Sequence, residues 1–203
     1  MGVRDRPAAR ARHQADPRQL GRRRLGAGRP GAGPERGAAC RLPETAEGVS
    51  VTPEEKLAEL GLELPPVPAP AAAYVPAVRT GNYVYTAGQV PFVAGKLPLT
   101  GKVGAEVSPE DAAGLARTCA LNALAAVASV TGGLAAVVRI VKVTGFVASD
   151  PGFTGQAQVI NGASELLQDV FGEAGKHARS AIGMAVLPLD SPVEVELIAE
   201  VSD

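Results

Sequence analysis

The order of the apolar segments between residues 72 and 203 constrains the fold of this chain most. Strand patterns lie at 74–78, at 83–90, at 137–149 and in the closing stretch 178–196, on either side of a turn at 188–192. Helical patterns begin after Ser108 and near Gly155, and end at Thr131 and Phe171. The resulting order is strand, strand, helix, strand, helix, strand, strand. It predicts an α+β sandwich with both helices on one face of a sheet.

Local signals fix the ends of these helices. Ser108-Pro109-Glu110-Asp111 combines a capping serine with proline at the first helical position, and Gly132 and Gly133 end the helix. Thr52-Pro53-Glu54-Glu55 is a capping box that predicts a further short helix, ended by Gly61. The prolines at 65, 66, 68 and 70 then predict an extended linker, so residues 51–71 are expected to form an N-terminal helix and a Pro-rich linker.

Two helices cover only one face of the predicted sheet, and the strands are apolar enough that the other face needs a cover. Homo-oligomerisation is the economical solution, because closed symmetry hides apolar surface and protects the edges of the sheet. Binding sites then tend to lie in clefts between subunits.

Residues 1–50 differ in composition from the rest. They hold eleven Arg, no Lys and five acidic residues, for a net charge of +6, whereas residues 51–203 hold nine basic and sixteen acidic residues, for a net charge of −7. Without a hydrophobic period they are expected to be disordered, either as a solvated tail or as an extension from a misassigned start codon. Contact of 22–24 with nucleic acid or anionic lipid is the alternative, although no aromatic residue interleaves these arginines to stack on bases.

Further features bound the class of protein. Cys40 and Cys119 are the only cysteines, form no disulfide framework and fit a reducing compartment, and Cys119 reads as a buried structural thiol. No secretory signal and no apolar run of membrane-spanning length are evident, so a cytoplasmic protein without a membrane partner is expected. Phosphate loops, nucleophile elbows and zinc-ligand spacings are absent from the sequence, which predicts neither a metal nor a cofactor.

The closing strands carry the most suggestive polar residues. Arg179 opens the first of them, where its guanidinium could grip a small carboxylate in a two-point fork or form an ion pair with a neighbouring acid. Glu194 and Glu196 share one face of the last strand, and a carboxylate there can position water or simply face solvent. His177, alone among histidines in the part expected to be ordered, is read as incidental because it lacks a partner motif.

Four segments together resemble the RidA/YjgF family, also known as L-PSP endoribonuclease-like proteins. They are 73–76, 81–91 (Gly-Asn-Tyr-Val-Tyr-Thr-Ala-Gly-Gln-Val-Pro), 159–161 (Val-Ile-Asn), and 178–180 (Ala-Arg-Ser) with 187–188 and 193–196. The resemblance covers about residues 72–201 and suggests a branch with somewhat longer chains, with 72–203 as the RidA-like domain.

The resemblance implies a chorismate-mutase-like fold with a mixed sheet, three subunits packed as a central barrel, and sites at the subunit interfaces. It implies hydrolysis of small 2-imino acids to 2-keto acids and ammonia without a cofactor. By matching position, Arg179 would grip the substrate carboxylate and Glu194 would position water. Four further positions match substrate contacts of the family: Tyr74, Gly88, Ala181 and Asn161. Ala87 departs from the family, which often has Ser there, and so puts efficiency and substrate choice in question.

Two alternatives stay open. A regulatory trimer that binds a small acid without turnover would share the same arginine. An RNA-acting protein is suggested by the family's older name, but the net charge of −7 on residues 51–203 opposes association with a polyanion.

Overall fold

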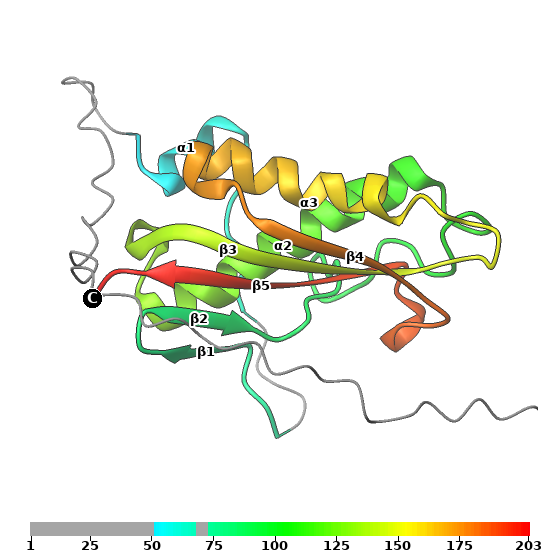
Figure 1. Cartoon of the computed structure of the whole chain (residues 1–203), viewed down its shortest axis with the longest axis horizontal. Helices are drawn as coiled ribbons and strands as arrows, with labels where there is room; N and C mark the ends of the chain where they lie inside the picture. The colour runs from blue at the N-terminus through cyan, green and yellow to red at the C-terminus, as the bar shows by residue number, and fades with distance from the viewer. Residues whose placement is uncertain (1–50, 68–72) are drawn as a thin grey trace, which may run out of the picture. The chain divides into compact units, whose positions relative to one another are not determined.

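The computed structural model describes residues 51–67 and 73–203 (Figure 1). The predicted extension at 1–50 and part of the predicted linker, 68–72, lie outside the described residues. The helices are α1 (Pro53–Glu59), α2 (Pro109–Thr131) and α3 (Gln156–Phe171), with short 3-10 turns η1 (Leu134–Ala136), η2 (Gly172–Gly175) and η3 (Pro188–Asp190). The strands are β1 (Ala77–Thr80), β2 (Tyr83–Thr86), β3 (Val137–Ala148), β4 (Ala178–Met184) and β5 (Val193–Val201).

The strands form one mixed sheet in the order β1-β2-β5-β3-β4. The pair β3 and β4 is parallel, and the other neighbours are antiparallel. The two closing strands therefore do not pair with each other, because β3 lies between them. Helices α2 and α3 pack against each other on one face of the sheet, as the element order predicted (Figure 1).

The core lies between the sheet and these helices. Every second residue of β5, from Val193 to Val201, is buried, and the residues between them are half-exposed. This period of two defines a helix face and an open face of the sheet. Along α2 and α3 the buried residues recur at helical spacing, as predicted.

The capping predictions are confirmed. Thr52 and Glu55 form the reciprocal capping box of α1, and the Ser108 hydroxyl accepts a hydrogen bond from the Asp111 amide at 3.0 Å. Gly132 ends α2 in the left-handed conformation, with φ of 78°.

The first strands differ from the prediction. β1 begins at Ala77 instead of residue 74 and extends beyond residue 78 to Thr80, so only Gly81 and Asn82 separate it from β2. β2 ends at Thr86, and only Gln89 returns to the sheet, in a single bridge to Val195. Gly88 lies in the irregular stretch between them, which moves this candidate site residue out of regular strand pairing.

One helix contact is unusually close. Gly162 of α3 lies directly against the backbone of Ala113 in α2, where any Cβ would overlap the Ala113 carbonyl oxygen. Glycine lets the two helix backbones approach at this point.

Among the described helices, α2 alone is long and apolar enough to cross a membrane by length and composition. The prediction that no apolar run reaches membrane-spanning length was therefore wrong. Half of its most apolar window is buried inside the molecule. Burial against the sheet and α3 accounts for its composition, as for a helix at the centre of a protein core.

Candidate functional site

Five of the six predicted site residues fall into two groups on opposite faces of the sheet: Arg179 with Asn161, and Glu194 with Gly88 and Tyr74. Arg179 on β4 is paired with Val143 of β3, which is buried on the helix face. Glu194 on β5 is paired with Phe146, three residues further along β3. Since side chains alternate between faces, an odd separation along β3 puts the two residues on opposite sides of the sheet. One copy of the chain therefore does not bring Arg179 and Glu194 to the same small ligand.

Helix α3 holds the Arg179 side chain in place. Its Nη1 donates hydrogen bonds to Asn161 Oδ1 at 2.9 Å and to Ser164 Oγ at 3.0 Å, and its Nη2 donates to the Ala157 carbonyl at 3.2 Å. Three of the five guanidinium N–H groups are thus used. The Nε–H and one Nη2–H make no hydrogen bond to the described part of the chain, and two N–H groups are what a two-point grip on a carboxylate requires.

Ser164 and His177 extend this cluster, and the sequence reading missed their role. The Ser164 hydroxyl lies 3.1 Å from His177 Nε2, and His177 Nδ1 lies 2.6 Å from the Gly175 carbonyl oxygen. Burial lowers the pKa of His177 and the Arg179 charge lowers it further, although the hydrogen bond to Gly175 opposes both. The spacing in the sequence could have indicated that Ser164 lies near Arg179, because Ser164 follows Asn161 by three residues and so shares its helix face.

Glu194 belongs to the other group. Gly88 lies so close that a Cβ there would overlap Glu194 Oε1, so only glycine leaves this space to the carboxylate. Burial raises the pKa of Glu194, and the neighbouring Glu196 charge raises it further. A carboxylate whose pKa is raised is a better proton acceptor than an ordinary surface glutamate.

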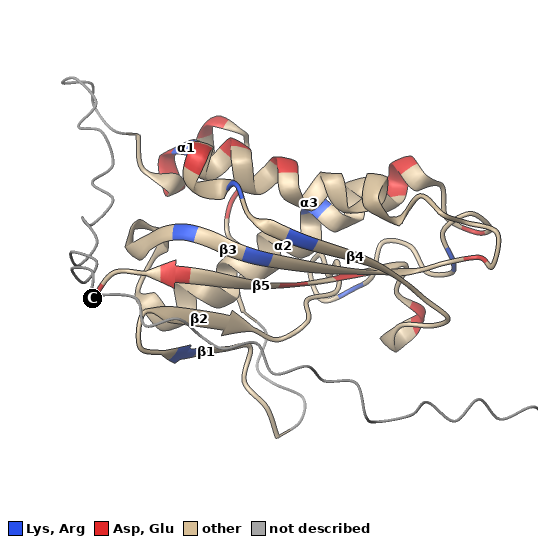
Figure 2. Ribbon diagram, in the orientation of Figure 1, with Lys and Arg blue, Asp and Glu red and all other residues tan. Residues whose placement is uncertain are grey.

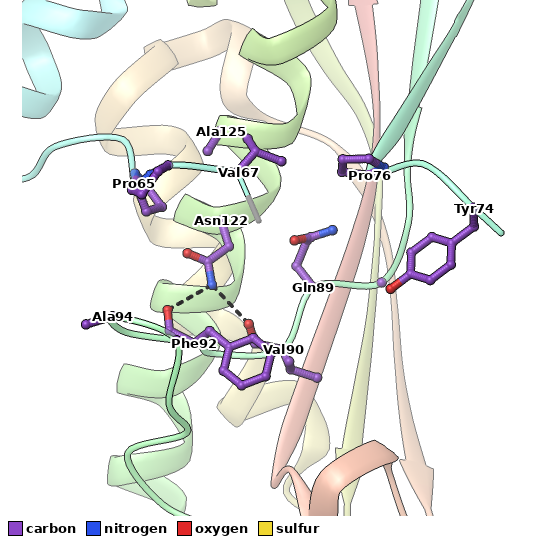
Figure 3. Close-up of a pocket in the computed structure, with 13 residues that line it drawn as sticks. Pro65, Val67, Tyr74, Pro76, Gln89, Val90, Phe92, Ala94, Asn122 and Ala125 are labelled. Atoms are coloured by element: carbon purple, nitrogen blue, oxygen red, sulfur yellow. Dashed lines mark hydrogen bonds between the residues drawn. The ribbon is translucent and has the colours of Figure 1, made fainter. Parts of the chain in front are cut away.

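Tyr74 and Gly88 both line a cleft of about 260 Å³ beside α2. Asn122 of α2 also lines this cleft and, as Figure 3 shows, donates to the carbonyl oxygens of Val90 at 3.0 Å and Phe92 at 3.2 Å. These bonds hold the loop that follows Gly88. Prolines and aliphatic side chains form most of the remaining wall, so this cleft is largely apolar.

Ala181 and Ala87 lie apart from both groups. Ala181 is paired with Gly145 and packs partly against the core, so only its backbone could serve a ligand. The amide of Ala87 is already bonded to the Pro76 carbonyl at 2.8 Å.

Possible metal ligands and the cysteine thiol can be located within the described ranges 51–67 and 73–203. No group of three His, Cys, Asp or Glu residues there could hold a metal ion. Cys119 is fully buried, and burial, followed by the Glu194 charge, raises the pKa of its thiol well above its usual range. It fits the predicted structural thiol, because a nucleophilic cysteine needs an accessible thiolate.

The mixed five-stranded sheet with two helices on one face is that of the chorismate-mutase-like class. A family model described as "YjgF/chorismate_mutase-like, putative endoribonuclease" matches residues 54–201. The chain belongs to this YjgF/RidA family, as the sequence motifs indicated.

Individual relatives agree with this assignment. Protein TCP17 of Trypanosoma cruzi is 40% identical over 148 residues, which are 72% of this chain and 92% of that protein. The crystal structure of Atu1372 from Agrobacterium tumefaciens, a protein of unknown function, has a TM-score of 0.70 and 45% identity over 74% of this chain and 94% of that one. A "putative endoribonuclease" of Shewanella oneidensis has a TM-score of 0.72 and 35% identity over 74% and 99% of the two chains.

Proposed function

We propose that this protein hydrolyses small 2-imino acids to 2-keto acids and ammonia without a cofactor. The observation that carries the proposal is the Arg179 guanidinium, which α3 holds through three hydrogen bonds while two N–H groups stay available. Such a pre-oriented fork suits the carboxylate of a small acid.

Glu194 supplies the base in this proposal. Water adds to the imine carbon and passes a proton to the Glu194 carboxylate. That proton is returned to the nitrogen, which gives a carbinolamine. Glu194 then takes the carbinolamine hydroxyl proton and passes it to the nitrogen, the carbon–nitrogen bond breaks, and ammonia leaves with the keto acid. The raised pKa of Glu194 suits both proton transfers.

The two halves of this site come from neighbouring copies of the chain in a homotrimer. The support is that Arg179 and Glu194 lie on opposite faces within one copy. The open face of the sheet also exposes large side chains that no described residue covers: Val78, Tyr83, Tyr85 and Ile182. Arg139 of β3 is paired with Glu200 of β5, so charges of both signs lie along these strands, as Figure 2 shows.

A coupled assay tests the proposal. A dehydratase generates 2-iminobutanoate, and the rate of ketoacid release is measured with and without this protein. The wild-type chain should accelerate release, and Arg179→Ala should abolish the effect, because two charge-assisted hydrogen bonds are worth about 1.5–3 kcal/mol each. Arg117→Ala is a matched control, since this arginine also bonds α3, through Asp169 at 3.2 Å, but lies outside both groups. An unaffected rate with wild-type protein would refute the proposal.

Two alternative functions, small-acid binding without turnover and RNA cleavage, predict different experimental results. Tight binding of 2-ketobutyrate without acceleration would favour a regulatory small-acid-binding trimer. RNA cleavage is favoured by the name of the Shewanella relative and opposed by the net charge of −7 on residues 51–203. Nuclease activity that persists after deletion of residues 1–48 and copurifies with the chain would favour it.

A further inference from the structure

Ser164 is oriented unlike the hydroxyls of α2. In that helix Thr118, Ser129 and Thr131 donate back to carbonyls of their own helix, at 3.3, 2.7 and 3.0 Å. This is the usual arrangement for a hydroxyl inside a helix. The Ser164 hydroxyl instead turns away from α3 toward His177 and Arg179.

The hydrogen bonds around His177 specify where its proton lies. The Gly175 carbonyl can only accept, so His177 Nδ1 donates to it at 2.6 Å and carries the hydrogen. Nε2 then holds a lone pair, and the Ser164 hydroxyl, 3.1 Å away, donates to it. Arg179 donates to the same hydroxyl oxygen and thereby stabilises negative charge on it. The Ser164 hydroxyl, the His177 ring and the Gly175 carbonyl therefore form a hydrogen-bonded chain of a nucleophile, a base and a group that orients the base.

The imidazole is suited to act as a base at neutral pH. Its burial and the adjacent Arg179 charge lower the pKa of His177, which keeps the ring neutral and able to accept a proton. Ser164 of α3 contacts this ring, Arg179 of β4 bonds the Ser164 hydroxyl and lines the same cleft, and Lys176 precedes the ring in the chain.

A cleft of about 260 Å³ gives access to this pair. Ser164, His177 and Arg179 line it together with Gln168, Gly175 and Lys176. The Lys176 side chain is exposed, lines this cleft, and forms an ion pair with Glu173 at 2.7 Å. The cleft combines a hydroxyl, an imidazole and cationic donors in a volume that admits a small molecule.

We propose that Ser164 and His177 form a nucleophile–base pair that cleaves small carboxylate-bearing esters in this cleft. The Ser164 oxygen bonds to the ester carbonyl carbon while its proton passes to His177 Nε2. The carbon–oxygen bond of the ester breaks, and the leaving alcohol takes that proton. Water then attacks the acyl-serine with His177 as base, which releases the acid and restores the hydroxyl. This activity uses Arg179 as the proposed imine hydrolysis does, but its chemistry is independent of Glu194 and of the imine.

Covalent labelling tests the pair directly in the full-length chain. Fluorophosphonate-rhodamine should modify Ser164, identified by tandem mass spectrometry of the tryptic peptide 143–176. His177→Gln should slow labelling about 100-fold or more, since a positioned general base contributes about 10² to 10⁴ in rate. Hydrolysis of 4-nitrophenyl hydrogen succinate should fall in parallel in the same variant.

Two serines of the same protein serve as internal controls. Ser180 accepts a hydrogen bond from a cation, Lys142 Nζ at 2.7 Å, and has no hydrogen bond to a histidine among the described residues. Ser149 shares the tryptic peptide with Ser164 and donates to the Val147 carbonyl. Both should stay unlabelled. Ser164→Ala should lose the label. If that variant fails to fold, Ser164→Cys keeps a side chain of similar size. It should no longer react with the fluorophosphonate, and iodoacetamide should instead alkylate the new thiol at a rate that depends on His177. Absence of label on Ser164, or equal labelling in His177→Gln, would overturn the proposal whatever the imine assay shows.

Discussion

The close approach of α2 and α3 at Gly162 makes a prediction with a defined sign. In Gly162→Ala the new methyl group would overlap the carbonyl oxygen of Ala113, which is backbone and cannot rotate away. Overpacking of this kind costs about 1–3 kcal/mol. Alanine would otherwise gain up to about 1 kcal/mol over glycine in a helix interior. Because the overlap is with backbone, the cost should fall in the upper part of this range, and we expect a net destabilisation of about 1–2 kcal/mol.

Gly114→Ala is the matched control for this substitution. Gly114 is an interior residue of α2, on the opposing helix, but a Cβ there meets no atom within 4 Å. The same chemical change should therefore stabilise the protein by about 0.5–1 kcal/mol. The two substitutions should differ in sign even though both replace a helical glycine by alanine.

Urea unfolding followed by circular dichroism measures both effects. Wild type and variants are compared at one protein concentration, because self-association would shift the apparent stability by mass action. The transition midpoint should fall for Gly162→Ala and rise for Gly114→Ala with unchanged slopes. If Gly162→Ala is as stable as wild type, the helices do not approach as closely as described, and the argument for the glycine is refuted.

Three further predictions concern the site and the helix ends. Gly88→Ala should displace the Glu194 carboxylate and so reduce the rate of imine hydrolysis at least about 10-fold, as enzyme kinetics would show. Because the carboxylate is the flexible end of a side chain and can move aside, the free energy of unfolding measured in urea should change by less than about 0.5 kcal/mol. Glu194→Gln should raise stability by about 0.5 kcal/mol at pH 7. Because burial raises the pKa of Glu194 in the folded chain, wild type loses stability as pH rises from the unfolded value toward the folded one. The gain should therefore shrink as the pH falls and vanish in unfolding curves at about pH 3, well below the unfolded pKa. Thr52→Ala removes the cap of α1 and should cost that helix about 1 kcal/mol, seen as faster amide exchange at 55–57 but not in α2.

Much of the fold follows from local patterns. The limits of α2 were predictable because Ser108 and Gly132 satisfy the ends of the helix with groups only a few residues away. The long strand β3 was predictable from its run of branched residues, which ends at the Asp150-Pro151-Gly152 turn. The limits of β2 were not, because β2 pairs with β5, more than a hundred residues later, and β1 in turn pairs with β2.

The candidate site was predictable in part. Two pairs of the predicted residues lie close together, Arg179 with Asn161 and Gly88 with Glu194, while their roles stay predictions. His177 was set aside because its partner, Ser164, is thirteen residues distant on another element. Nothing in the sequence between them indicates that a helix and a loop would place the two side chains in contact.

The sequence by itself determined the order of the elements, the ends of the helices and the residues that share a face within each strand. These properties depend on neighbours a few positions apart, where the periods of helix and strand act directly. Only the tertiary structure decided that Arg179 and Glu194 lie on opposite faces of the sheet. Their spacing in the chain crosses a turn, and the alternation of faces can be counted only through the register that both strands make with β3.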